Sequence, residues 1–216
     1  MFFSNPILLI IAFLFSLAIH EAAHAYVSDR LGDPTARLAG RATLNPLAHL
    51  DPLGTLLPLL LLFTGSPIIF GWGKPVPLDP FNLRHPRRDA ALISFAGPAA
   101  NLSLAILLAI LIRLAHLFLG PTGFFVELTL TPIIALNIMW AFFNLIPIHP
   151  LDGGKVLVGL LPQNLAYKWD EFLRQYGFII LFFLIFPFFG RSPIISFISP
   201  LVHFFLTLLL PGTPLV

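Results

Sequence analysis

The chain contains the segment HEAAH, in which His20 and His24 enclose Glu21. On a helix, residues four apart lie on one face, so both imidazoles can bind one zinc ion. Glu21 then lies close enough to act on a water molecule bound to that ion. The segment lies within a long apolar stretch, where histidine and carboxylate side chains are costly unless they have a function. The spacing therefore predicts a hydrolytic zinc site inside a membrane.

A hydrolytic zinc ion has three protein ligands and one position open to water. The chain has no cysteine, so the third ligand must be an imidazole or a carboxylate. We predict Asp152, because Pro147 and Pro150 break the preceding apolar helix and two following glycines free the backbone to turn. His149 is the alternative ligand; otherwise it lines the substrate groove or supports the site through a second layer of contacts.

The composition indicates a protein whose solvent is the lipid bilayer. Of 216 residues, 57% are hydrophobic and 10% are charged, whereas soluble domains carry roughly 25% charged residues. The formal net charge of +2 argues against a nucleic-acid partner. This length allows one integral-membrane domain, residues 1–216, and no second globular domain. The N-terminal apolar stretch continues into HEAAH without a cleavage site, so we expect a retained span.

The apolar pattern predicts an all-α polytopic membrane protein with about five to six transmembrane helices. The expected helices cover residues 6–27, 89–119, 128–146, 176–189 and 194–210. A short amphipathic piece should follow Asp152, and a polar turn should include residues 168–174. These helices have to bring the HEAAH segment and Asp152 to the same depth.

Residues 36–78 are expected to form a re-entrant hairpin with a short β segment. The alternating pattern of residues 36–44 weakly suggests a strand. Residues 52–63 are apolar but short for a span, and the following residues up to 77 are rich in proline and glycine. Irregular backbone inside a membrane needs water or protein around it, which suggests a wet cavity. An edge strand at 36–44 or 66–76 could pair with an unwound substrate. Whether residues 52–77 cross the membrane or re-enter stays open.

The basic residues favour one orientation. If residues 52–77 enter and leave by the same face, all but Arg113 and Arg191 of the 12 basic residues lie on one side. The positive-inside rule then puts the HEAAH end of the first helix toward the cytoplasm. Together with the absence of a transit peptide, this predicts a multi-pass protein of a prokaryotic plasma membrane.

Two motifs together resemble the site-2 protease family of intramembrane zinc metalloproteases. HEAAH matches the family's HExxH helix, and NLIPIHPLDGG matches its NxxPxxxLDG segment. The stretches GRATLNPLAHLDPLGT, FGWGKPVP and AGPAAN resemble the compact prokaryotic branch, which lacks PDZ and CBS domains. The resemblance implies one zinc ion on His20, His24 and Asp152, with Glu21 as the catalytic base.

The same resemblance implies hydrolysis of peptide bonds within or next to transmembrane helices of membrane-protein substrates, with single-span proteins as the expected class. Asn144 matches a family asparagine that helps to hold the substrate, and His149 is a second candidate for substrate binding. The chain is too short for a PDZ or CBS domain, so regulation through such domains is not expected.

A membrane transporter of zinc or another divalent metal is the alternative function, because it too places His and Asp inside the bilayer. A transporter needs no general base and often has paired half-repeats, which this sequence lacks. Among the other polar residues, we expect Asn101 to serve mainly helix packing and Asp33 to be a solvated loop charge. We expect His49 and Asp51 to be turn and interface residues.

Overall fold

The computed structural model describes residues 6–63, 71–187, 190 and 192–210. The long helices are α1 (Pro6–Leu31), α4 (Pro86–Leu119), α5 (Gly123–Asn144), α7 (Gln163–Ile185) and α8 (Pro193–Leu209). Shorter helices are α2 (Thr35–Leu38), α3 (Pro52–Phe63) and α6 (Asp152–Leu160), with 3-10 turns η1 (Pro46–His49), η2 (Pro80–Asn82) and η3 (Gly120–Thr122). No sheet occurs in these ranges, so the prediction of a helical protein is confirmed for them.

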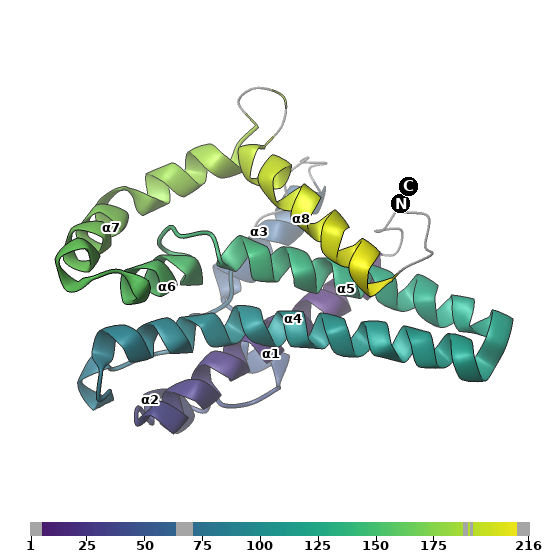
Figure 1. Ribbon diagram of the computed structural model, residues 1–216, viewed down its shortest axis with the longest axis horizontal. Helices are drawn as coiled ribbons and strands as arrows, with labels where there is room; N and C mark the ends of the chain where they lie inside the picture. The colour runs from purple at the N-terminus through teal and green to yellow at the C-terminus, as the bar shows by residue number, and fades with distance from the viewer. Residues whose placement is uncertain (1–5, 64–70, 188–189, 191, 211–216) are drawn as a thin grey trace.

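The α4–α5 hairpin forms the long axis of the molecule, and α1 crosses it (Figure 1). The last helix, α8, packs on α5, while α6 returns to pack on α4. The core between α4, α5 and α8 alternates small and large side chains: Ala105, Ala109, Ile112, Ile134, Ala135, Ile138, Leu206 and Leu210. The alanines let the helix backbones approach closely, which is how helices associate without a hydrophobic driving force.

A second apolar cluster holds the link between α5 and α6. Ile146 and Leu151 of this link are buried against Leu181 of α7 and two isoleucines of α8. Pro147 and Pro150 cannot donate to a helical ladder, so α5 ends at Asn144. Packing therefore holds the link in place, and this fixes the position of Asp152, the first residue of α6.

Two stretches of the described residues are long and apolar enough to cross a membrane, Ile10–Leu31 and Pro86–Asn144. The second stretch contains both α4 and α5. α8 is apolar but shorter. The count of five to six spans therefore stays a prediction.

Two details of the predicted secondary structure are wrong. Residues 36–44 are not a strand: the segment begins inside α2 and continues as turns. The Asp33 carboxylate accepts hydrogen bonds from the backbone and the hydroxyl of Thr35, at 3.1 and 2.5 Å, and this contact at the start of α2 overrides the alternating pattern. Residues 168–174 are not a turn either, because α7 runs unbroken through them with their polar side chains mostly exposed.

The predicted hairpin at 52–77 is described at both ends. Residues 52–63 form α3, residues 64–70 lie outside the described ranges, and residues 71–78 have no helix or strand apart from a bridge at Gly73. Leu50 and Gly73 form an isolated antiparallel bridge, and the amide of Lys74 donates to the carbonyl of His49 at 2.8 Å. The chain therefore returns to the place that it left. Part of the predicted edge strand, residues 66–70, lies outside the described residues.

Candidate metal centre

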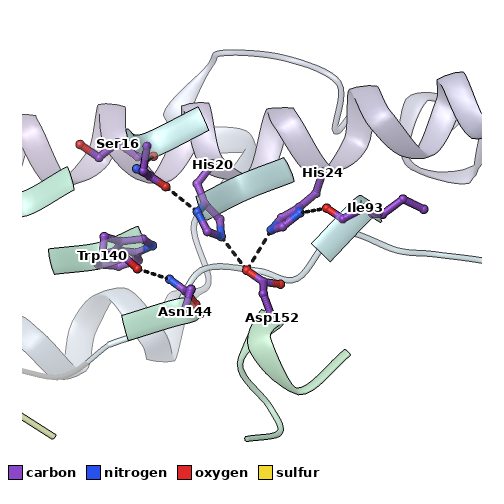
Figure 2. Close-up of polar contacts among 8 residues, drawn as sticks. Ser16, His20, His24, Ile93, Trp140, Asn144 and Asp152 are labelled. Carbon is purple, nitrogen blue, oxygen red and sulfur yellow. Dashed lines mark hydrogen bonds and ion pairs between the residues drawn. The ribbon is translucent and has the colours of Figure 1, made fainter. Parts of the chain in front are cut away.

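His20 and His24 of α1 face Asp152 at the start of α6 (Figure 2). The Asp152 Oδ2 atom lies 3.1 Å from His20 Nε2 and 3.3 Å from His24 Nε2. One ligand atom from each residue falls within 4.8 Å of the other two. Both histidines are buried, at 3% and 7% exposure. The structure thus brings together the two histidines and the distant aspartate that the sequence predicts as ligands.

The other ring nitrogen of each histidine faces an oxygen acceptor. His20 Nδ1 lies 2.6 Å from the side-chain oxygen of Asn101, and His24 Nδ1 lies 2.6 Å from the backbone carbonyl of Ile93. Both acceptors belong to α4. A neutral imidazole has one N–H, and these acceptors favour that proton on Nδ1. The Nε2 lone pairs are then free to bind a metal ion.

This arrangement fits a divalent cation. With both protons on Nδ1, the two Nε2 lone pairs and the Asp152 carboxylate face one another with no proton between them. Three such acceptors would repel one another in a buried site, whereas one cation satisfies all of them. Two imidazoles and a carboxylate form a catalytic zinc set that leaves a fourth position open.

Gly97 of α4 provides room beside the three ligands. A Cβ atom at this position would lie 2.5 Å from His24 Nε2 and 2.6 Å from His20 Nε2. Such a contact is too close for any side chain, so the α4 backbone can approach the metal-facing atoms only because residue 97 is glycine. The space that a metal ion needs is therefore kept clear from the α4 side.

The glycines after Asp152 have a different role from the predicted one. Gly153 and Gly154 lie in α6 with ordinary helical backbone angles, so conformational freedom is not what they provide. A Cβ atom on Gly153 would collide with the backbone carbonyls of Leu145 and Ile146. These glycines let the first turn of α6 pack tightly on the preceding link, which fixes the position of Asp152.

The remaining predicted residues lie outside the ligand cluster. Glu21 is half-buried on α1, next to His20 in sequence. Asn144 is the last residue of α5, and its amide donates to the Trp140 carbonyl at 3.0 Å (Figure 2). His149 Nε2 lies 3.2 Å from an Asp170 oxygen on α7, so its ring is engaged away from the metal cluster. The structure therefore favours Asp152 over His149 as the third ligand.

Comparison with known proteins agrees with this geometry. A family model described as Peptidase family M50 matches residues 122–186. The Bacillus subtilis (strain 168) protein named "Putative zinc metalloprotease YwhC" is 38% identical over 180 residues, 82% of this chain and 78% of that protein. The chain belongs to the site-2 protease family, peptidase family M50. Membership of the site-2 protease family makes it a metallopeptidase.

Other relatives point to the same family. "Putative zinc metalloprotease Rip2" of Mycolicibacterium smegmatis is 35% identical over 83% of this chain, which spans 66% of that protein. "Zinc metalloprotease MJ0392" of Methanocaldococcus jannaschii is 24% identical over 92% of this chain, which spans 48% of that protein. No solved structure is significantly similar to the chain.

In this site-2 protease family member, the sequence did not reveal the polar contacts behind the candidate ligands. Asn101 is fully buried, and besides the predicted helix packing it accepts a hydrogen bond from His20. Asn137 of α5 and Ser16 of α1 complete a buried network with it and had not been singled out. The available signal was the segment AGPAAN, which sets Gly97 and Asn101 four residues apart on one face of α4.

Proposed function

We propose that the chain is an intramembrane zinc metalloprotease that hydrolyses peptide bonds within or next to the transmembrane helices of other membrane proteins. One zinc ion per chain is bound by His20, His24 and Asp152. The observation that carries this proposal is the convergence of two Nε2 atoms and a carboxylate, with both Nδ1 atoms hydrogen-bonded to acceptors behind them.

Glu21 serves as the general acid–base. When bound, zinc supplies a Lewis acid that polarises the scissile carbonyl and acidifies the attacking water. The Glu21 carboxylate takes a proton from that water as the new C–O bond forms. It then delivers the proton to the amide nitrogen as the C–N bond breaks, so that one water is consumed for each peptide bond.

The substrate helix must unwind before its peptide bond becomes accessible, and its freed backbone groups then need hydrogen-bond partners. Since residues 36–44 are not a strand, residues 71–76, which include the bridge residue Gly73, are the remaining candidate for strand addition. Asn144 and His149 lie at the end of α5 and in the link to α6, and we assign them to substrate contacts there. Residue 75 is already proline, so proline is placed in turn at positions 71, 72, 73, 74 and 76, where it should reduce cleavage while zinc content stays unchanged.

The whole chain, residues 1–216, is proposed to be a single integral-membrane domain. It crosses a prokaryotic plasma membrane several times, and its active site lies toward the cytoplasmic side. Two observations support this proposal. Two stretches are apolar and long enough to cross a membrane, and most basic residues lie in segments that the proposed topology puts on one side.

Zinc content and cleavage, measured on the same purified preparations, test the function. Wild type, Asp152→Ala and Glu21→Gln are compared by metal analysis and by cleavage of a single-span model protein in detergent. Wild type should hold one zinc ion and cleave, whereas Asp152→Ala should lose both properties. Glu21→Gln should retain zinc and lose activity by ~100-fold or more, since general acid–base catalysis contributes ~10²–10⁴-fold.

Glu127→Gln is the matched control, because Glu127 pairs with His116 away from the metal centre. It should change neither zinc content nor cleavage. A metal transporter would behave differently from a protease in this series: it would show no cleavage in wild type, and Glu21→Gln would cost little transport. Cleavage by Glu21→Gln at the wild-type rate would exclude Glu21 as the base.

A further inference from the structure

The chain contains a buried amide network behind His20 that spans three helices. Asn101 of α4, Asn137 of α5 and Ser16 of α1 are each at most 1% exposed. The Asn101 Nδ2 group donates to Asn137 Oδ1 at 2.8 Å, and Asn137 Nδ2 donates to Ser16 Oγ at 2.9 Å. Hydrogen bonds in such a dry place are costly to leave unmade, so each amide is held firmly.

Backbone carbonyls determine which way both amides face. Asn137 Nδ2 lies 2.9 Å from the carbonyl of Ile133, which can only accept, so the Asn137 oxygen must face Asn101. Asn101 Nδ2 lies 3.3 Å from the carbonyl of Ser16 and 2.8 Å from that Asn137 oxygen. With its NH₂ group engaged by two acceptors, Asn101 has only its oxygen to present to His20 Nδ1, 2.6 Å away.

We propose that Asn101 is a positioning residue that fixes the His20 tautomer for metal binding, and that Asn137 acts through Asn101 by holding its amide in the required orientation. This inference rests on the proposed metal centre. If the Asn101 amide turned over, its NH₂ group would face His20 Nδ1 and favour the tautomer whose proton sits on Nε2. That proton would occupy the metal-facing position, and zinc would have to displace it.

His24 provides a comparison within the same site. Its Nδ1 partner is the backbone carbonyl of Ile93, whose direction is set by the α4 helix and which no side-chain substitution removes. His20 lies one turn closer to the middle of the membrane-spanning stretch, and a side chain supplies its acceptor. The two ligands therefore reach the same protonation pattern by different means, and only that of His20 depends on side chains.

The test measures zinc affinity by competition with a chelator in detergent. The variants are Asn101→Leu, Asn101→Asp, Asn137→Leu and the double variant Asn101→Leu/Asn137→Leu. Asn101→Leu removes the acceptor and should weaken zinc binding ~10–100-fold, the usual cost of losing such a partner. Asn101→Asp keeps an acceptor for His20 and should retain most of the affinity.

Asn137→Leu leaves Asn101 in place but frees its amide to turn, so zinc binding should weaken severalfold. The double variant should be no weaker than Asn101→Leu, because Asn137 acts only through Asn101. Ser103→Ala, an exposed change two residues further along α4, is the control and should bind zinc like wild type. The d–d spectrum of the Co²⁺-loaded protein should change in the same variants, which a purely structural role would not produce.

Wild-type affinity in Asn101→Leu, or equal losses in Asn101→Asp and Asn101→Leu, would overturn the inference. If Asn101→Leu does not fold, unchanged affinity in Asn137→Leu would overturn it. The proposed function can fail without this inference. If wild type binds zinc but cleaves no substrate, proteolysis is refuted, while the zinc affinities of the variants still test the positioning role. Wild type that binds no divalent metal overturns both.

Discussion

At the scale of single residues, the most demanding position is Gly97, because a Cβ atom there would occupy space that the metal-facing nitrogens need. We expect Gly97→Ala to weaken zinc binding by at least about tenfold, since the His20 and His24 rings must turn aside. Alanine itself favours a helix interior by ~0.5–1 kcal/mol over glycine, so α4 should remain folded. Zinc affinity and the thermal unfolding midpoint of the zinc-free protein are the two measurements.

Ser103→Ala on the same helix controls for any general effect of substitution in α4, since this side chain bonds only the Ala99 carbonyl in the described structure. A Gly97→Ala protein with wild-type zinc affinity would show that the metal does not lie against α4. A variant that fails to fold would instead indicate that the glycine serves helix packing alone.

The cluster of His20, His24 and Asp152 could be predicted from sequence because the residue types and their spacing are those that a metal site needs. His20 and His24 follow helical periodicity, and Asp152 stands out as a charge in an apolar region. Gly97 and Asn101 carry a weaker signal, their four-residue spacing in AGPAAN, which is equally typical of close helix packing. That spacing does not reveal that Asn101 accepts from His20, which is 81 positions away, or how closely two helices cross at Gly97.

At the scale of elements, the Asp33 side chain joins the turn after α1 to η2. It is fully buried, and its carboxylate accepts hydrogen bonds from Ser28, Thr35, the Asp79 amide and Asn82. The expectation of a solvated loop charge is therefore wrong. The charged residues close to Asp33 in the sequence predicted that its side chain is exposed to solvent. Asp79 and Asn82, which contact Asp33, lie more than forty positions further along the chain.

Burial alone would raise the pKa of Asp33, but the hydrogen bonds from Thr35, Asn82 and Asp79 outweigh it and lower the pKa to about 2. A carboxyl group whose pKa is lower in the folded state stabilises the fold above its unfolded pKa of ~3.9. That stabilisation, about 2–3 kcal/mol, should disappear as the pH falls from about 4 to about 2.

Asp33→Asn should therefore lower the thermal unfolding midpoint at pH 6, because an amide cannot accept all of these hydrogen bonds. The difference between the variant and wild type should shrink as the pH falls to 2 and below, where the wild-type carboxyl group becomes protonated and neutral. Thermal unfolding in detergent over this pH range measures both effects. A difference that is constant with pH would contradict the lowered pKa.

At the scale of the whole molecule, two contacts bear on how the chain crosses the membrane. The hydrogen bond between Asp33 and Asn82, 2.9 Å long, puts the end of α1 beside the residues that precede α4. The bridge between Leu50 and Gly73 brings together the two ends of the segment that contains α3. In the proposed topology, a segment whose ends meet in this way would enter and leave on one side, which is the condition under which the basic residues concentrate on one face.

The natural absence of cysteine makes this topology directly measurable. Single cysteines replace Leu38, Phe81 and Thr122, all exposed, and a membrane-impermeant maleimide is applied to spheroplasts and to inverted vesicles. We expect Leu38→Cys and Phe81→Cys to react only in inverted vesicles, and Thr122→Cys, in the turn between α4 and α5, only in spheroplasts. Wild type should not react, and every variant should react after permeabilisation. Reaction of Leu38→Cys and Phe81→Cys in different preparations would mean that residues 51–72 cross the membrane. Reversal of all three patterns would preserve the re-entrant segment but put the metal centre toward the outer face.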